Sequence, residues 1–233
     1  MHQNLESLEK ALGIIFHNKS FLYEAVTHRS YLNENPRWEY PHNERLEFLG
    51  DAVLELAVTE RLFHRYPNSP EGHLTSIRAA LVNYQMMAEV ARALRIEDYL
   101  LLSRGEAKDV GRAREVILAN AMEAVIGAVY LDQGYEPTQR LILRCVVEPH
   151  LEIIIENSLY KDPKSHLQEV VQERFRVTPR YQLAEEWGPD HKKIFRMAVY
   201  FGDDVVAEGE GYSKQEAEVE AAKNALKKVA GSE

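Results

Sequence analysis

The chain has 233 residues, of which 45% are hydrophobic and 28% are charged, and this composition excludes a disordered or fibrous protein. Its length predicts two domains, each able to bury a core. Its net charge of −9 argues against binding of a phosphate backbone through bulk charge. Any such binding must therefore come from local basic patches or from metal ions that neutralise acids.

Two features that the sequence lacks, a pair of cysteines and a secretory signal, indicate the cellular compartment. The single cysteine, Cys145, cannot form a disulfide within the chain, and residues 1–10 lack the basic and apolar start of a secretory signal. The longest stretch nearly free of charge, residues 116–131, is shorter than the roughly 20 apolar residues that span a bilayer. We therefore expect a cytoplasmic protein without a membrane span.

Amphipathic patterns with helical spacing fill the first part of the chain. They cover residues 5–12, 19–28, 43–66, 75–93, 116–131 and 136–156. Proline clusters and a glycine-containing charged segment supply the connections between them. We expect an all-α domain over residues 1–157.

The composition changes after residue 157, where a linker over residues 158–161 is expected. A helical pattern, three alternating segments and a final helix with alanine at every fourth position follow. They cover residues 165–175, 180–186, 194–201, 205–210 and 213–229. This α-β-β-β-α order predicts an α+β domain over residues 162–233, with an antiparallel three-stranded sheet and both helices on one face.

One side of the predicted helix over residues 43–66 is acidic, and the opposite side is apolar. The acids are Glu44, Glu47, Asp51 and Glu55, and the apolar residues are Leu46, Leu49, Val53 and Leu56. No Lys or Arg within the stripe offsets the acids, so they repel one another and a cation is expected there. Mg²⁺ binds carboxylate oxygens and can be shared by carboxylates one turn apart. The alternative is a surface helix whose acids pair with basic residues elsewhere.

Glu123 is the only ionisable residue of the apolar pattern over residues 116–131, so we expect it on a buried helix. A buried carboxylate must be paired, bind a metal or stay protonated, and a core arginine is the structural alternative. Asn120, one turn earlier on the same face, can offer a carbonyl oxygen. Gly50 in mid-helix predicts close approach of another backbone. Glu71 opens a further helix and is a weak signal by itself.

The segment from Asn43 to Asp51, with the sequence Asn-Glu-Arg-Leu-Glu-Phe-Leu-Gly-Asp, resembles the signature nonapeptide of bacterial ribonuclease III. Residues 71–72 before a helix, residues 118–127 and the C-terminal module, which is similar to a double-stranded RNA-binding domain, extend the resemblance over essentially the whole chain. It implies an endonuclease that cleaves double-stranded RNA to 5′-phosphate and 3′-hydroxyl ends in rRNA and mRNA processing. It also implies a homodimer through the nuclease domain, with each subunit cutting one strand.

The resemblance also implies the roles of site residues. Metal ligands for Mg²⁺, with Mn²⁺ as a substitute, would be Glu47, Asp51, Asn120 and Glu123. Residues serving catalysis would be Asp51, Glu123, Glu44 and Glu71, the last two at the cleft and the subunit interface. Members of the family normally carry Asp at the position of Asn120, and an amide gives the metal a weaker field. The alternative function is therefore a duplex-RNA-binding protein with an impaired nuclease domain.

The C-terminal module must read duplex RNA with polar groups in the shallow minor groove and with cations on the phosphates across the next groove. We expect the groove contacts early on its first helix, and the phosphate contacts at a loop and at a helix N-terminus. The expected residues are Gln168, Glu169, His191, Lys192, Lys193, Ser213 and Lys214. From Asp162 onward the module has 11 Lys and Arg against 14 Asp and Glu, so binding must rest on local geometry.

Overall fold

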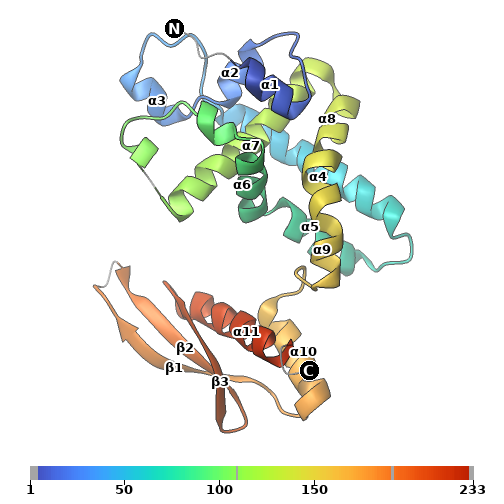
Figure 1. Cartoon of the computed structure of the whole chain (residues 1–233), viewed down its shortest axis with the longest axis vertical. Coiled ribbons are helices and arrows are strands. Elements are labelled where there is room, and N and C mark those ends of the chain that lie inside the picture. The colour runs from blue at the N-terminus through green and yellow to red at the C-terminus, as the bar shows by residue number, and fades with distance from the viewer. Residues whose placement is uncertain (1–4, 109, 190–191, 231–233) are drawn as a thin grey trace. The chain divides into compact units, whose positions relative to one another are not determined.

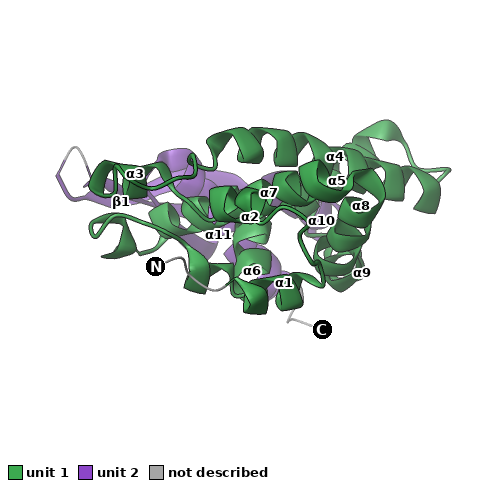
Figure 2. Cartoon of the chain, turned by 90° about the horizontal axis from the view of Figure 1, so that it is seen from above, with its two compact units in different colours: residues 1–160 green, residues 161–233 purple. Residues whose placement is uncertain are grey.

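The computed structural model describes residues 5–108, 110–189 and 192–230. The chain forms two compact units, Met1–Tyr160 and Lys161–Glu233, each with its own hydrophobic core (Figure 2). The expected linker over residues 158–161 falls between the last helix of the first unit and the first helix of the second. Within the described ranges, no helix is long and apolar enough to cross a membrane.

The described elements of the first unit are all helical, which confirms the predicted fold class (Figure 1). They are α1 (Glu6–Leu12), α2 (Ser20–Ala25), α3 (Arg29–Glu34), α4 (Glu44–Arg65), α5 (Glu71–Val82), α6 (Tyr84–Ala93), η1 (Ile96–Tyr99), η2 (Glu106–Lys108), α7 (Arg112–Gln133), α8 (Tyr135–Ile142), η3 (Leu143–Val147) and α9 (Glu148–Glu156). The long helices α4 and α7 pack against each other, and α7 also packs against α2, α6 and α8. The apolar residues of α7 between Ile117 and Val129 are buried, so this helix forms the centre of the core.

Two predicted helices are interrupted. The pattern over residues 75–93 is two helices, α5 and α6, because the backbone at Asn83 is extended and its side chain accepts a hydrogen bond from the Met86 N–H at 2.9 Å, capping α6. The pattern over residues 136–156 contains the π-helical segment η3. Pro149 follows η3 and has no N–H with which to continue an α-helical ladder.

The second unit has the predicted α-β-β-β-α order. Its elements are α10 (Pro163–Phe175), β1 (Arg180–Trp187), β2 (Ile194–Phe201), β3 (Asp204–Gly211) and α11 (Lys214–Ala230). The sheet is antiparallel with the strand order β1-β2-β3, and β2 pairs Arg196 with Glu185 on one side and with Glu210 on the other. Its core combines apolar residues of both helices and of the sheet, including Leu167, Val171 and Val199.

The alanine face of α11 explains how closely this helix packs on β3. Ala217, Ala221 and Ala225 are fully buried. A Cβ on Gly209 would lie 2.1 Å from the backbone nitrogen of Ala221, and one on Gly211 would lie 2.6 Å from that of Ala217. Only small residues on both elements allow this distance, so the spacing of alanine in the sequence predicts the buried face of the helix.

Candidate active site and RNA-binding surface

The candidate active site lies where α4 crosses α7. A Cβ on Gly50 would lie 1.8 Å from the carbonyl oxygen of Glu123, and a Cβ on Gly127 would lie 2.3 Å from the carbonyl oxygen of Leu46. No side chain fits at either glycine, so the two helix backbones touch. The prediction that Gly50 marks the close approach of another backbone is confirmed.

Carboxylates from both helices meet at this crossing. Glu47 and Asp51 stand one turn apart on α4, on either side of Gly50, and Glu123 comes from α7. Glu47 and Glu123 are half-buried and Asp51 is exposed. Among the described residues, no Lys, Arg or His forms an ion pair with any of the three, and no core arginine bonds to Glu123. Asn120, also half-buried, lies one turn before Glu123.

The electrostatics of the crossing disfavour ionised carboxylates. Burial, followed by the charges of Asp51 and Glu47, raises the pKa of Glu123 to about 8. Burial, followed by the charges of Glu44 and Asp51, raises the pKa of Glu47 above its usual range. These groups are partly removed from water and lie close to like charges, and a divalent cation would relieve both effects.

The donor set fits Mg²⁺, which prefers carboxylate and amide oxygens. In the side-chain positions of the described residues, however, no three His, Cys, Asp or Glu groups are arranged to hold an ion together. Binding of an ion at the crossing would therefore require carboxylate side chains to rotate toward it.

Two other predicted catalytic residues have protein partners. The Glu44 carboxylate lies 3.3 Å from Nη1 of Arg29 and 3.8 Å from Nδ1 of His42, so Arg29, a cation outside the acidic stripe, offsets it. Glu71 begins α5, where its carboxylate accepts a hydrogen bond from the Thr75 hydroxyl at 2.8 Å. The structure thus groups Glu47, Asp51 and Glu123, with Glu44 as a neighbour that acts on Glu47 through its charge.

The sequence analysis missed an exposed apolar face on α4. Phe48, Leu56 and Phe63 are 81%, 56% and 66% exposed, although Leu56 was placed on the apolar side with residues that are buried. Next to this face, Phe63 and Glu71 line a cavity of about 410 Å³ between α4 and α5. Apolar residues that extend around the helix beyond its buried side were the signal that could have predicted a second contact surface.

Two of the predicted phosphate-binding cations, Lys193 before β2 and Lys214 at the start of α11, lie near the same aromatic ring. The Lys193 ammonium lies 2.8 Å from the Glu186 carboxylate and 5.8 Å from the centre of the Phe195 ring. The Lys214 ammonium lies 6.0 Å from the same ring. The hydrogen bond from Lys193, with a smaller contribution from the charge of Lys214, lowers the pKa of Glu186.

The two residues predicted to contact the minor groove are exposed on α10. Gln168 has an exposed side chain, while the Glu169 carboxylate lies 2.6 Å from the Lys161 ammonium. That contact lowers the pKa of Glu169. Gln168 is therefore available for contact with a ligand, and Glu169 must first exchange its partner.

Ser213, another predicted contact, lies at the start of α11. The Ser213 hydroxyl accepts a hydrogen bond from the Glu216 N–H at 3.1 Å, and the Glu216 carboxylate accepts one from the Tyr212 N–H at 3.0 Å. This reciprocal cap fixes the N-terminus of the helix. Lys192 is exposed, and His191 lies outside the described residues.

Comparison with known proteins defines the class of each unit. Residues 18–150 match the family described as Ribonuclease-III-like, and residues 163–229 match the double-stranded RNA binding motif. The chain is 47% identical over 224 residues to Ribonuclease 3 of Carboxydothermus hydrogenoformans, covering 96% of this chain and 95% of the relative. It is 44% identical over 229 residues to Ribonuclease 3 of Dehalococcoides mccartyi, covering 98% and 96%.

Solved structures agree with these relatives. The nuclease domain of ribonuclease III from Campylobacter jejuni is 40% identical, with a TM-score of 0.57 over 64% of this chain and 97% of that domain. A second structure of that nuclease domain, described for flexibility in a region involved in dimer formation, is 42% identical, with a TM-score of 0.55 over 61% of this chain and 98% of that one.

The two units together define an endoribonuclease, a hydrolase with a helical nuclease unit (residues 1–160) and an RNA-binding unit (residues 161–233) that binds double-stranded RNA. The chain belongs to the ribonuclease III family.

Proposed function

We propose that this chain cleaves double-stranded RNA in a reaction that depends on Mg²⁺, for which Mn²⁺ can substitute, and that it leaves 5′-phosphate and 3′-hydroxyl ends. The observation that carries the proposal is the group of carboxylates without protein cations at the crossing of α4 and α7. When bound, Mg²⁺ supplies an activated water and stabilises the charge on the departing 3′ oxygen. The family resemblance supports rRNA and mRNA processing as the setting.

The chain's own residues would divide the work at this crossing. Glu47, Asp51 and Glu123 would hold the ion, and Asn120 would add its amide oxygen. Asp51 is the exposed member of the group, so its carboxylate can also face the RNA. Glu44, held by Arg29, would increase the negative charge near Glu47.

We propose that two copies pair through the apolar face of α4, so that each subunit cuts one strand. Phe48, Leu56 and Phe63 would be covered by the same face of the second copy, as two-fold symmetry requires. Exposed patches of large apolar side chains are typical of such interfaces. Glu71 lines the cavity beside Phe63, so it would lie next to the subunit boundary. Phe48→Asp should convert a dimer into monomers in sedimentation experiments, and an unchanged dimer would contradict this interface.

The RNA-binding unit would supply most of the affinity for the duplex. Gln168 and Glu169 would contact the minor groove, and Lys192, Lys193, Ser213 and Lys214, with His191, would contact phosphates. The chain before Asp162 is acidic, with 17 Lys and Arg against 23 Asp and Glu, and should repel phosphate in the absence of metal. Removing residues 161–233 should therefore severely weaken duplex binding at moderate salt in a gel-shift assay. Unchanged affinity would overturn this assignment.

The decisive experiment is a cleavage assay on one long duplex RNA with a titration of Mg²⁺. Glu123→Gln should lower the rate by more than the roughly 100-fold that loss of an outer-shell partner costs, because it removes a ligand charge. Glu55→Gln is the matched control, since it neutralises an exposed acid of the same stripe that is outside the proposed ligand set. Duplex binding in a chelator should be retained in both variants, and the melting temperature should not fall in either. An active Glu123→Gln would refute the metal assignment.

The second candidate function is a duplex-RNA-binding protein with an impaired nuclease site. The observation that favours it is Asn120, an uncharged side chain beside Glu123 where the family resemblance implies an acid. The same assay separates the two functions, because an impaired protein retains long duplex RNA without cutting it at any Mg²⁺ concentration.

A further inference from the structure

The nuclease unit contains a polar cavity built from residues outside the carboxylate site. It has a volume of about 580 Å³ and lies between the turn after α1 and the segment that runs from the end of α7 through α8 into η3. Arg140, Arg144 and His17 supply nitrogen donors to its lining. Leu12 and Leu141 contribute apolar surface.

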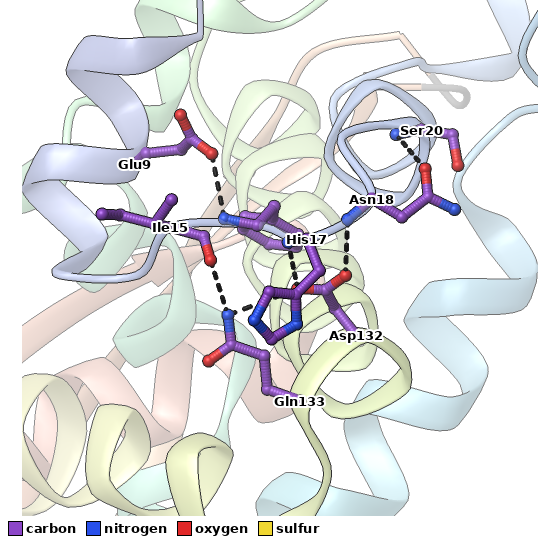
Figure 3. Close-up of polar contacts among 8 residues, drawn as sticks. Glu9, Ile15, His17, Asn18, Ser20, Asp132 and Gln133 are labelled. Carbon is purple, nitrogen blue, oxygen red and sulfur yellow. Dashed lines mark hydrogen bonds and ion pairs between the residues drawn. The ribbon is translucent and has the colours of Figure 1, made fainter.

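The turn after α1 forms one wall of this cavity, and hydrogen bonds hold that turn in position (Figure 3). The Asp132 carboxylate accepts from the backbone N–H groups of His17 at 2.9 Å and Asn18 at 2.8 Å. The side-chain amide of Gln133 donates to the carbonyl of Ile15 at 2.8 Å. The turn is therefore held in place by the end of α7, and both buried carboxylates beside it already have partners. Asp132 has two backbone donors, and Glu9 accepts from the Phe16 N–H at 3.0 Å and lies 3.1 Å from the Lys19 ammonium.

The opposite wall places a guanidinium group against the turn. Arg144 lies in the π-helical segment η3, and its Nη2 donates to the carbonyl oxygen of Leu12 at 2.5 Å. Gly13 has a φ of +61°, and a Cβ there would lie 2.6 Å from Nη1 of Arg144. Glycine thus serves the left-handed backbone and leaves room for the guanidinium group. π-Helical segments of this kind are common at functional sites.

The charges of the cavity are uncompensated. Within the part of the chain that the structure describes, no carboxylate forms an ion pair with Arg140 or Arg144. Some arginines of this unit pair with acids, as Arg114 does with Glu97 at 2.9 Å. The cavity instead brings two guanidinium groups without an acidic partner to one lining, in a chain that has 37 acidic residues against 28 basic ones.

We propose that this cavity binds a small phosphate ester of nucleotide size. Arg140 and Arg144 would hold the phosphoryl group, since two planar guanidinium groups match a doubly charged oxyanion through paired N–H donors. Leu12 and Leu141 would contact the less polar remainder of the ligand. The volume exceeds what a phosphate ion alone requires, and therefore an ester is the better fit.

The test measures ligand binding to the full chain in a chelator, which keeps divalent ions away from the carboxylate site. The probes are a nucleoside 5′-monophosphate, inorganic phosphate and the unphosphorylated nucleoside. Binding of each probe is measured by calorimetry and by the shift in melting temperature. Arg140→Gln removes one guanidinium group, and Arg140→Lys keeps the charge without the paired donors. Arg37→Gln, at an exposed arginine outside the cavity, is the matched control.

The parent chain and Arg37→Gln should bind the monophosphate with a saturable rise in melting temperature. Arg140→Gln should weaken that binding by at least about tenfold, and Arg140→Lys should fall between, because one charge-assisted contact is lost. The melting temperature without ligand reports whether each variant is folded. Equal binding by all variants, no response to either phosphate probe, or a response to the nucleoside alone would overturn the proposal. So would an effect of Arg140→Gln confined to duplex RNA, since the cavity would then be part of the RNA contact.

Discussion

In the nuclease unit α4 meets α7 at Gly50 and Gly127, and in the RNA-binding unit α11 meets β3 at Gly209 and Gly211. Both contacts bring one backbone against another with no side chain between them. The contact in the nuclease unit positions acids that have no protein cation, whereas the RNA-binding unit pairs its charges with each other. Both units therefore contain a close backbone contact, but one contact positions unpaired acids and the other belongs to a unit whose charges are largely paired.

The paired charges of the RNA-binding unit are numerous. Lys164 lies 2.5 Å from Glu218, and Arg196 interacts with three glutamates of neighbouring strands, among them Glu210 at 2.7 Å. Lys193 is similarly paired with Glu186. A paired cation such as Lys193 would have to exchange its carboxylate for an RNA phosphate, whereas an ion that entered the proposed metal site would displace no protein cation. Exposed pairs contribute little stability, so the exchange is inexpensive in free energy.

The largest effects on stability are expected from substitutions at the glycines of the two close backbone contacts. Gly50→Ala should lower the stability of the nuclease unit by about 2 to 3 kcal/mol, because the new methyl group overlaps the Glu123 carbonyl. Gly209→Ala should have a similar effect on the RNA-binding unit alone. Gly72→Ala is the control, since nothing lies within 4 Å of a Cβ there, and helix propensity limits its effect to about 1 kcal/mol in the stabilising direction. Chemical denaturation followed by probes in each unit measures all three, and a tolerated Gly50→Ala would contradict the crossing.

The carboxylates make the metal-free nuclease unit sensitive to pH. Glu123 has a pKa of about 8 in the folded chain, above its usual value of 4.5, so the folded state binds the extra proton between these two values. Stability should be highest below pH 4.5 as far as this group is concerned, and should fall as the pH rises toward 8. Melting temperatures in a chelator should show this decline, and Glu123→Gln should flatten it. Added Mg²⁺ should restore stability at pH 8 by mass action. A decline of equal slope in Glu123→Gln would assign the effect to other groups.

The substitution Asn120→Asp adds a carboxylate to the group of acids that already lacks a protein cation. The Mg²⁺ concentration for half-maximal cleavage should fall by about tenfold, the equivalent of one good charge contact of about 1.4 kcal/mol, and the rate should rise. The same variant should be less stable than the parent in a chelator, since like charges repel. A rate titration with Mg²⁺ beside the parent measures the first effect. An unchanged titration would remove position 120 from the ligand set.

The smallest effect is expected from the two lysines before β2, of which Lys193 is paired with Glu186. Replacing Lys192 and Lys193 together by Ala should reduce the slope of log affinity against log salt by up to about two units, equally for different duplex sequences. The loss should be smaller than for two free lysines, because Glu186 already neutralises Lys193. Replacing Lys223 and Lys227, exposed on α11, controls for the change in net charge. A sequence-dependent loss would indicate base recognition instead of phosphate contact.

The sequence predicts those parts of the molecule that depend on local pattern. Three features can be predicted from local pattern alone, whatever element packs against them. They are the alternation of the three strands, the alanine face of α11 and the long apolar stretch of α7. Gly50 and Glu123 were recognisable because each breaks the pattern of its own helix. In both cases the exception predicted a contact between elements distant in the sequence.

Other features depend on contacts that no local pattern contains. The break at Asn83 requires an extended backbone and a side-chain cap, and an amphipathic pattern continues through it. The pairing of Lys193 with Glu186 depends on the register of β1 with β2. Leu56 was assigned to the wrong environment because helical spacing gives the direction of a side chain and does not say which faces the core covers.

The contact between Gly50 and Gly127 also bears on selection among metal ions. With no side chain between the helices, the separation of the α4 and α7 backbones is fixed by main-chain atoms and cannot widen or narrow by a change of rotamer. Mg²⁺ takes oxygen ligands at about 2.0 to 2.1 Å and Ca²⁺ at about 2.3 to 2.6 Å. At the proposed metal site, the difference in ionic radius would then have to be accommodated by the carboxylate side chains, because the glycine contact sets the separation of the two main chains.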